Sequence, residues 1–358
     1  MSQGGDNNDG DAARSEAWWR PDRFAARRGH LDIRRRVIAA IRTFFSESDF
    51  LEVETPALQV SPGLEPHLVA FATALLEPGA AARPRYLHTS PEFAMKKLLV
   101  AGLPRIFQLA HCFRNAERGA THHPEFTMLE WYRAPAGYRD LMADCERLLR
   151  ACLAASGRGT FTWRGRSADP GKPWQVISVA EAFRHYCGID LLATAPDPAA
   201  PSRDRLAAAA APLGIAPHDG DHWEDLFFRI FLERIEPELG NGAPTLLYDY
   251  PISMAALARA KPGDSRLAER FELYVCGLEL ANAFGELTDA ATQRRRFIAD
   301  QAAKRERYGE AYPIDEDFLA ALAHGLPECA GAALGVDRLV MLASGAATID
   351  EVLWAPVA

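Results

Sequence analysis

Residues 113–132 read FRNAERGATHHPEFTMLEWY, and residues 335–338 read GVDR. Around the first stretch, residues 105–113 and 126–133 are rich in apolar and aromatic side chains, whereas the residues between them are polar. This pattern predicts two strands joined by a polar loop. Ahead of the second stretch, the small residues 332–334 predict a strand that runs into a helix.

Both stretches carry an arginine where a phosphate could be bound. Arg114 ends the first expected strand, and Arg338 stands at the start of the expected helix, close to Gly335. A planar guanidinium can hold a phosphate oxygen through two hydrogen bonds and can stabilise charge that develops on it. Taken alone, the loop is also typical of a solvated hairpin, and Arg338 could instead pair with the adjacent Asp337.

The remaining segments mix helices and strands without the regular alternation of a doubly wound parallel sheet. Helical spacing of apolar residues, and short apolar runs bounded by proline or glycine, define the other expected elements. Helices are expected at 33–48, 91–101, 140–154, 179–186 and 289–308, and strands at 50–55, 86–89, 270–276 and 278–284. This order predicts an α+β fold with a largely antiparallel β-sheet flanked by helices.

The composition is that of a globular protein with an acidic balance. Of the 358 residues 48% are apolar, and the formal net charge is −8, which disfavours a broad basic face for nucleic acid. The six cysteines form neither a Cys-x-x-Cys pair nor a cluster with histidine, so we expect reduced thiols in a cytoplasmic protein. We expect no membrane segment, because apolar runs are too short, and no secretory signal.

The same composition divides the chain into parts. Residues 1–28 are polar up to Trp18 and Trp19 and predict a disordered N-terminal tail. Residues 29–358 are expected to form one catalytic domain. Within it, the Ala/Pro-rich segment 194–217 predicts an insertion.

Three glutamates accompany the expected hairpin at 270–284. Glu272, Glu279 and Glu286 are spaced by seven, and a turn at Gly277 would place them on two strands and let them converge. Convergent carboxylates repel one another, so they need cations. An exposed acidic hairpin is the alternative, but the interleaved leucines and phenylalanine favour a strand that faces the core.

Together these stretches resemble the class II aminoacyl-tRNA synthetases. Residues 113–132 look like motif 2, ALGVDR at 333–338 looks like motif 3, and FLEVETP at 50–56 looks like motif 1, the dimer-forming element. Glu130, Tyr132 and the stretch GLELANAFGEL that begins at Gly277 are similar to the lysine branch of that class.

That branch normally carries an N-terminal β-barrel for the anticodon, yet here the helix that leads to motif 1 begins about thirty residues into the chain. A catalytic domain without the barrel is typical of the bacterial elongation factor P lysine ligases. The resemblance to that family covers residues 30–357 and includes TSPE at 89–92 and MK at 95–96. It implies a class II catalytic domain that forms a homodimer.

The resemblance implies ATP and Mg²⁺ as the nucleotide substrate and the metal. Arg114 and Arg338 would be catalytic and bind the α- and γ-phosphates, Phe126 would stack on adenine, and Glu272 and Glu279 would hold the metal. The implied ATP-binding residues are Arg114, Asn115, Glu117, His122, His123, Phe126, Glu279, Leu280, Gly335 and Arg338.

The resemblance also implies a pocket for lysine or (R)-β-lysine. Glu92 would bind the ammonium near the carboxylate, Asn282 the carboxylate, and Tyr132 with Glu286 the far ammonium. A ligand with two ammonium groups explains a pocket rich in acids. The implied substrate-binding residues are Ser90, Pro91, Glu92, Glu130, Tyr132, Asn282, Glu286 and Ala333.

The chain departs from the family pattern at three positions. Ala116 replaces a glutamate of motif 2, so Glu117 would take over its contact with adenine. His123 replaces an asparagine that often precedes Pro-Glu-Phe. Ala333 replaces the glycine of lysyl-tRNA synthetases, and one methyl group of this kind gives about 1–3 kcal/mol of discrimination, here expected to favour β-lysine.

The predicted function is therefore an ATP-dependent ligase. It would activate (R)-β-lysine, or lysine less efficiently, to an acyl-adenylate and transfer the acyl group to the ε-amine of a specific lysine of elongation factor P. One alternative is a truncated lysyl-tRNA synthetase, which the absent barrel and the acidic balance disfavour. Another is a non-catalytic paralogue that binds lysine or nucleotide, which the intact Arg114 and Arg338 disfavour.

Overall fold

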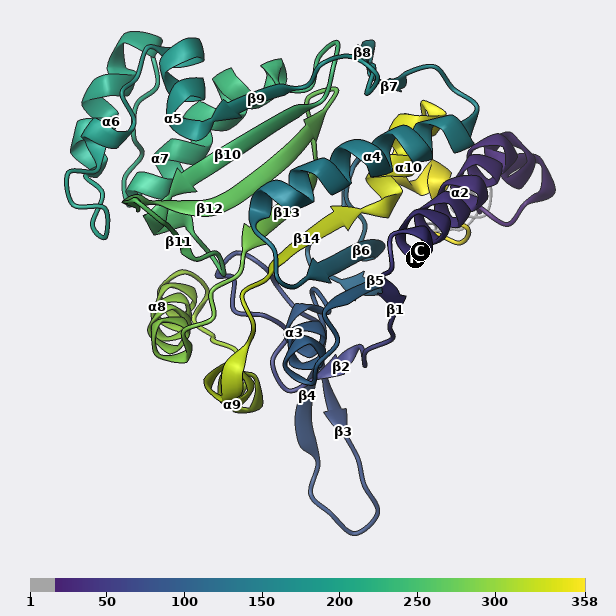
Figure 1. Ribbon diagram of the computed structural model, residues 1–358, viewed down its shortest axis with the longest axis horizontal. Coiled ribbons are helices and arrows are strands. Elements are labelled where there is room, and N and C mark those ends of the chain that lie inside the picture. The colour runs from purple at the N-terminus through teal and green to yellow at the C-terminus, as the bar shows by residue number, and fades with distance from the viewer. Residues whose placement is uncertain (1–16, 358) are drawn as a thin grey trace, which may run out of the picture.

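The computed structural model describes residues 17–357, and within them a nine-stranded sheet forms the centre of the molecule (Figure 1). Its strands are β1 (Leu51–Glu52), β5 (Arg105–Phe113), β6 (Glu125–Arg133), β9 (Gln175–Ser178), β10 (Thr245–Pro251), β11 (Ala260–Lys261), β12 (Asp264–Val275), β13 (Leu278–Gly285) and β14 (Ala330–Gly335). The order is β1-β5-β6-β14-β13-β12-β10-β9, with β11 paired to β12. Only the β1–β5 and β9–β10 pairs are parallel among these described strands, so the predicted α+β fold with a largely antiparallel sheet is confirmed.

Local sequence explains the strands that build the site. The turn between β12 and β13 needs two left-handed residues, Cys276 (φ 57°) and Gly277 (φ 74°), and a glycine adopts this conformation without strain. The strand expected at 50–55 is shorter than predicted. Only Leu51–Glu52 pair with β5, because Val53 forms a single further bond to Phe107 and a proline follows at 56.

One face of the sheet is covered by the helices α2 (Pro21–Glu47), α4 (Tyr138–Ser156) and α10 (Val336–Ser344) (Figure 1). Four apolar residues of the first helix are buried here, whereas two are partly buried: the first are Ile33, Val37, Ile41 and Phe45, and the others are Ile38 and Phe44. The ring of Phe45 stacks on Phe107 of β5 with centroids 4.7 Å apart and also packs against Trp131 of β6. Burial of these aromatic groups fixes the helix against the sheet.

The N-terminal helix begins inside the predicted tail, so the boundary at residue 28 was placed too late. α2 starts at Pro21, a residue suited to the first turn of a helix. Arg27 explains the extension, because its guanidinium donates to the carbonyl oxygens of Asp350 (2.7 Å) and Leu353 (3.0 Å). The first sixteen residues of the tail lie outside the described part of the chain.

A second layer packs at the β9–β10 end of the sheet and contains the predicted insertion. It is formed by α5 (Val179–Ala182), α6 (Arg203–Ala210) and α7 (Trp223–Ile230), with a π-helical turn at Phe183–Cys187 after α5. Leu206 and Ala210 of α6 are fully buried in this layer. The indole of Trp223 donates to Thr194 Oγ1 at 3.0 Å. The segment 194–217 is therefore an integral part of a second core.

The opposite end of the molecule carries α3 (Glu92–Val100), α8 (Ala290–Tyr308) and α9 (Glu316–Gly325), beside a projecting sheet of β2 (Leu58–Gln59), β3 (Ala72–Leu75) and β4 (Arg83–Leu87) (Figure 1). The helix predicted at 91–101 begins at Glu92 with Pro91 at the N-cap position, and Ser90 Oγ, one residue earlier, accepts the N–H of Glu92 at 3.1 Å. A small hairpin, β7 (Phe161–Trp163) and β8 (Arg166–Ala168), completes the strands of the described region.

Two expectations from composition can be compared with the structure. All six cysteines are buried and unpaired within the described residues, as expected for reduced thiols. Across residues 17–357, no helix combines the length and the apolar character needed to cross a membrane.

Candidate active site

A cavity of about 430 Å³ lies where β6, β13 and β14 meet the β5–β6 loop and the first turns of α3 and α10. Most residues that the sequence predicts for the site line this cavity. They are Ser90, Glu92, Arg114, Glu117, His122, His123, Phe126, Glu130, Tyr132, Glu279, Leu280, Asn282, Glu286, Ala333, Gly335 and Arg338. The predicted residues Asn115, Pro91 and Glu272 belong to the described chain but lie outside the lining.

Arg338 is fixed at the start of α10 by contacts with the cavity wall. Its Nη1 donates to the carbonyl oxygen of Glu279 (2.8 Å), Nη2 lies 2.7 Å from His122 Nε2, and Nε donates to the carbonyl oxygen of Thr121 (3.3 Å). Burial and the charge of Arg338 lower the pKa of His122, so its imidazole is neutral and can accept this hydrogen bond. Arg338 therefore turns towards β13 instead of pairing with Asp337.

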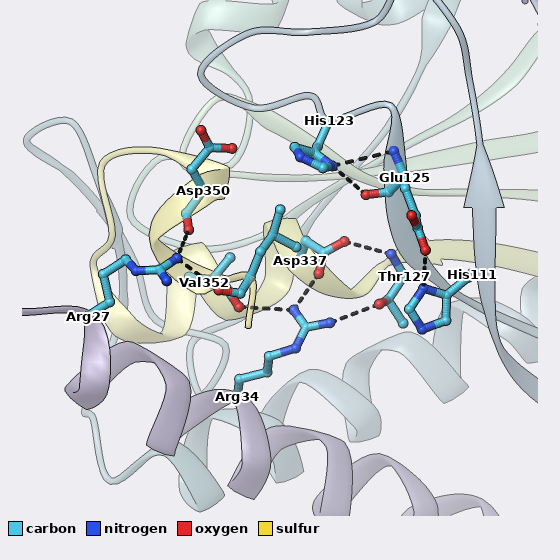
Figure 2. Close-up of polar contacts among 10 residues, drawn as sticks. Arg27, Arg34, His111, His123, Glu125, Thr127, Asp337, Asp350 and Val352 are labelled. Atoms are coloured by element: carbon cyan, nitrogen blue, oxygen red, sulfur yellow. Dashed lines mark hydrogen bonds and ion pairs between the residues drawn. The ribbon is translucent and has the colours of Figure 1, made fainter. Parts of the chain in front are cut away.

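Asp337 belongs to a buried network that joins α2, β6 and α10 (Figure 2). Arg34 binds Asp337 Oδ1 and donates to Thr127 Oγ1 at 2.8 Å, while the N–H of Thr127 donates to Asp337 Oδ2 at 2.7 Å. The side chains of Arg34 and Asp337 are only 6% and 2% exposed. One buried ion pair thus ties the helix that leads to motif 1 to the segments that resemble motifs 2 and 3.

Arg114 faces the cavity from the end of β5. Its guanidinium carbon lies 5.2 Å from the ring centre of Phe126, and its buried Nε has no acceptor among residues 17–357. A free donor beside an aromatic ring suits a ligand that combines an anion with a planar base. Asn115 does not reach the cavity, because its Oδ1 accepts the N–H of Ala116 at 2.9 Å and its own N–H donates to Val69 at 2.7 Å.

His123 contacts the C-terminal segment. Its Nδ1 lies 2.6 Å from the carbonyl oxygen of Glu125 (Figure 2). Its Nε2 accepts the N–H of Val357 at 3.1 Å. Arg118 in the same loop donates two hydrogen bonds, of 3.2 and 3.1 Å, to the carbonyl oxygen of Val357. Backbone groups occupy both ring nitrogens of His123, so neither nitrogen is free to contact a nucleotide as the sequence predicted. The C-terminal segment instead braces the loop.

The other half of the cavity is acidic and contains one buried lysine. Lys96 Nζ lies 2.5 Å from one carboxylate oxygen of Glu92 and 2.5 Å from one of Glu286. Although burial alone would lower it, the charges of Glu286 and Glu92 raise the pKa of Lys96 above its usual range. Sequence analysis did not assign Lys96 to the site. The signal that could have found it is its position four residues after Glu92, on the same face of α3.

Glu130 lies on β6 beside this ion pair. Its carboxylate accepts hydrogen bonds from the hydroxyls of Ser90 and Tyr132, the latter at 3.0 Å. Burial, and then the charge of Glu92, raise the pKa of Glu130 to about 8. Burial also raises the pKa of Glu286, which is 1% exposed, against the opposing effect of Lys96. A bound cation would therefore offset the repulsion among these buried carboxylates and lower their pKa values.

The prediction that all three hairpin glutamates converge is wrong, because only two of them lie close together. Glu272 and Glu279 lie close together, so that burial and the charge of Glu272 raise the pKa of Glu279 to about 7. The carboxylate of Glu272 is held by Arg270 (2.7 Å) and by the hydroxyl of Tyr274 (2.5 Å). Glu286 follows the end of β13 and joins Lys96 instead. The reason is the length of the hairpin, in which β12 alone has 12 residues. Glu279 lies near the turn, whereas Glu286 lies just past the far end of β13.

Two small residues of β14 lie at the cavity, and close approach of neighbouring side chains explains the first of them, Gly331. A Cβ added at Gly331 would lie 2.1 Å from the Tyr132 ring and 2.6 Å from Glu286 Oε1, so only glycine leaves room for both side chains. Ala333 lines the cavity opposite Glu130 in the β6–β14 register and packs near Phe126.

Glu65 is a cavity residue that sequence analysis missed. It lies on the loop after β2 and lines the cavity next to Ser90 and Glu92. Its Oε2 is buried and accepts no hydrogen bond from any residue in the described part of the chain. Burial and the charge of Glu92 raise the pKa of Glu65, whereas Arg114 and Lys96 act in the opposite direction. The loop lacks a recognisable motif, so its sequence offered no signal.

Comparison with known proteins agrees with this geometry. The family model described as tRNA synthetases class II (D, K and N) matches residues 18–357. Similar curated proteins are named elongation factor P–(R)-β-lysine ligase. The protein from Sodalis glossinidius is 41% identical over 340 residues, which cover 94% of this chain and 97% of that protein. The protein from Proteus mirabilis is 39% identical over 342 residues, which cover 95% of this chain and 97% of that protein.

Proposed function

The chain belongs to the class II tRNA synthetases (D, K and N), and within them to the elongation factor P–(R)-β-lysine ligases, and on this basis we propose its reaction. It activates (R)-β-lysine, or lysine less efficiently, with ATP and transfers the acyl group to the ε-amine of a specific lysine of elongation factor P. The observation that carries this assignment is the division of one cavity into a half with two arginines and a half with buried carboxylates.

In the first half-reaction, the substrate carboxylate attacks the α-phosphorus of ATP and pyrophosphate leaves. Arg114 binds the α-phosphate and stabilises the charge that develops on it, because its free donor faces the cavity. Phe126 stacks on adenine beside that guanidinium. Arg338, held by His122 and β13, binds the γ-phosphate. Gly335 leaves space for the nucleotide beside Arg338, since it lines the cavity and a Cβ there would lie 3.6 Å from Arg338 Cδ.

The acidic half binds the two ammonium groups of the amino acid. Glu92 binds the amino group nearer the carboxylate, while Tyr132 and Glu286 bind the far one. Glu286 Oε1 is buried and has no hydrogen-bond donor among the described residues, which is costly unless a ligand provides one. Asn282 of β13 binds the carboxylate. The methyl group of Ala333 favours an amino group on the β-carbon.

Mg²⁺ fits beside the triphosphate at Glu279. This carboxylate lines the cavity, and the nearby charge of Glu272 raises its pKa, so a hard cation there would relieve the repulsion. When bound, Mg²⁺ supplies positive charge to the phosphate oxygens. Glu272 acts through its charge, because Arg270 and Tyr274 already occupy its oxygens. Groups of three or more candidate ligands are absent from residues 17–357, so the phosphates would complete the coordination.

The homodimer implied by motif 1 is part of this proposal. On the segment after α2, Leu51 at the β1 edge of the main sheet is 53% exposed, and Leu58 of β2 and the following Val60 are 39% and 45% exposed. Neighbouring exposed apolar side chains of this kind favour an interface between two copies. Light scattering after size-exclusion chromatography would show a mass of two chains, and a monomer at micromolar concentration would refute it.

The test compares both half-reactions and both classes of acceptor. Pyrophosphate exchange into ATP is measured with (R)-β-lysine and with lysine, and acyl transfer is measured with purified elongation factor P and with total tRNA. We expect exchange with both amino acids, faster with (R)-β-lysine, and labelling of elongation factor P alone. Labelling of tRNA alone would favour a truncated lysyl-tRNA synthetase, and the absence of exchange would favour a non-catalytic binding protein.

A further inference from the structure

The proposed reaction brings three ammonium groups into the cavity. The net negative charge of the acidic half matches that number. Four carboxylates, those of Glu65, Glu92, Glu130 and Glu286, lie in or beside the acidic half, together with the single ammonium of Lys96. When all are ionised, three negative charges are left. The amino acid supplies two ammonium groups, and the acceptor lysine supplies the third. One carboxylate is therefore available for the acceptor.

Glu65 is the carboxylate that the amino acid does not use. Glu92 and Glu286 are already joined to Lys96, and Glu130 to the hydroxyls of Ser90 and Tyr132. Glu65 lies apart from the strands, on the loop after β2, and residues 17–357 provide no donor for its buried Oε2. A buried carboxylate oxygen without a donor is costly unless a ligand supplies one.

Glu65 lines the same cavity as Glu92 of the acidic half and Arg114 of the phosphate half. Its carboxylate is close enough to Glu92, on the amino-acid side, and to Arg114, on the phosphate side, for both charges to act on it. The loop is held in place from α8. Lys304 is 1% exposed and donates to the carbonyl oxygens of Pro66 (3.2 Å) and Leu68 (2.8 Å). The carboxylate is therefore positioned by a fixed backbone.

We propose that Glu65 is a catalytic residue of the second half-reaction, in which it binds the acceptor lysine of the protein substrate and removes a proton from its ammonium group. The free amine then attacks the carbonyl carbon of the acyl-adenylate. A C–N bond forms, the C–O bond to the phosphate breaks, and AMP leaves with the bonding electron pair. The second proton of the nitrogen passes to solvent. This inference rests on the proposed function and deepens it.

Glu65→Gln separates the steps, because it keeps the shape of the side chain and removes its charge and basicity. We expect pyrophosphate exchange, with its KM for the amino acid, to stay within about threefold of the wild type. Transfer to elongation factor P at pH 7 should fall by about 10²-fold or more, the size of a general-base contribution. Hydroxylamine is largely unprotonated at neutral pH and needs no base. Its hydroxamate should therefore form from the adenylate at the wild-type rate.

Asp300→Asn provides the matched control. Asp300 lies on α8 outside the cavity lining, and burial and the charge of Glu65 raise its pKa to about 7, so this variant removes a second acidic group from the same neighbourhood. We expect transfer within about threefold of the wild type. An equal loss of transfer in both variants would show that surface charge attracts the acceptor and would overturn the role of Glu65 as a base.

Other outcomes are equally decisive. Loss of exchange in Glu65→Gln with a raised KM for the amino acid would assign Glu65 to the activated substrate, and unchanged transfer would remove it from the reaction. If the wild-type enzyme exchanges pyrophosphate and transfers nothing to elongation factor P, the proposed function fails and this inference fails with it. If the wild type transfers and the variant transfers equally well, the inference alone fails.

Discussion

Replacement of Arg34 by methionine should destabilise the protein strongly, although Arg34 lies outside the cavity lining. The change leaves the carboxylate of Asp337 buried at 2% exposure without its cation, and it removes the donor to Thr127. Removal of one partner of a buried ion pair lowers the free energy of unfolding by about 3–5 kcal/mol. Urea unfolding would measure the difference in the free energy of unfolding between the variant and the wild type. Both are compared at one protein concentration, because the apparent stability of a dimer depends on concentration.

Two further variants make this measurement specific. Arg35→Met removes a neighbouring arginine whose ion pair with Asp32 is 66% and 58% exposed, and it should cost less than about 1 kcal/mol. Adding Asp337→Asn to Arg34→Met should recover part of the loss, because an amide oxygen can still accept the N–H of Thr127 without leaving a buried charge. Arg34→Met within about 1 kcal/mol of Arg35→Met would refute the reasoning.

Three other predictions concern the cavity. Arg338→Ala should abolish pyrophosphate exchange while the circular dichroism spectrum stays that of the wild type, and full activity would contradict its phosphate role. Gly331→Ala should weaken lysine binding more than ATP binding, since a Cβ there meets Tyr132 at 2.1 Å. Gly335→Ala should fold normally and weaken ATP binding, since a Cβ there meets only Arg338, at 3.6 Å. Calorimetric titration of each ligand would measure both effects, and the reverse pattern would contradict the two assignments. Because burial and Glu92 raise the pKa of Glu130 to about 8, the empty pocket holds a proton at pH 7 that a bound ammonium expels, so lysine affinity should increase from about pH 6 to 8. Titrations in buffers of different ionisation enthalpy should detect this released proton, and a pH-independent affinity would exclude it.

Patterns of neighbouring residues predicted most of the fold. The polar loop between two apolar runs predicted β5 and β6 to within one residue, and a glycine between two apolar runs predicted the β12–β13 hairpin. Local propensity determines such elements. The start of α2 was predicted too late, because Arg27 gains its partners from residues 350 and 353, more than three hundred positions away. A contact of that separation leaves no trace in a local window of sequence.

The cavity shows the same limit. Family-like motifs located Arg114, Arg338 and the acids of β6 and β13, but Lys96 and Glu65 depend on how α3 and the loop after β2 fold back over the sheet. His123 shows why a motif position does not define a role. The sequence places it beside the nucleotide loop, and the C-terminal backbone then occupies both of its ring nitrogens.

The position of β14 within the sheet affects how the chain is made. This strand follows every other described strand in the sequence, yet it lies between β6 and β13 and joins the two arginine-bearing motifs. During synthesis, the two halves of the sheet therefore wait with open edges until residues 330–335 leave the ribosome. A chain that is terminated before them exposes two unpaired strands, and such edges promote aggregation. Premature termination before residue 330 thus yields aggregation-prone fragments instead of partly active enzyme, although most of the chain has then been made.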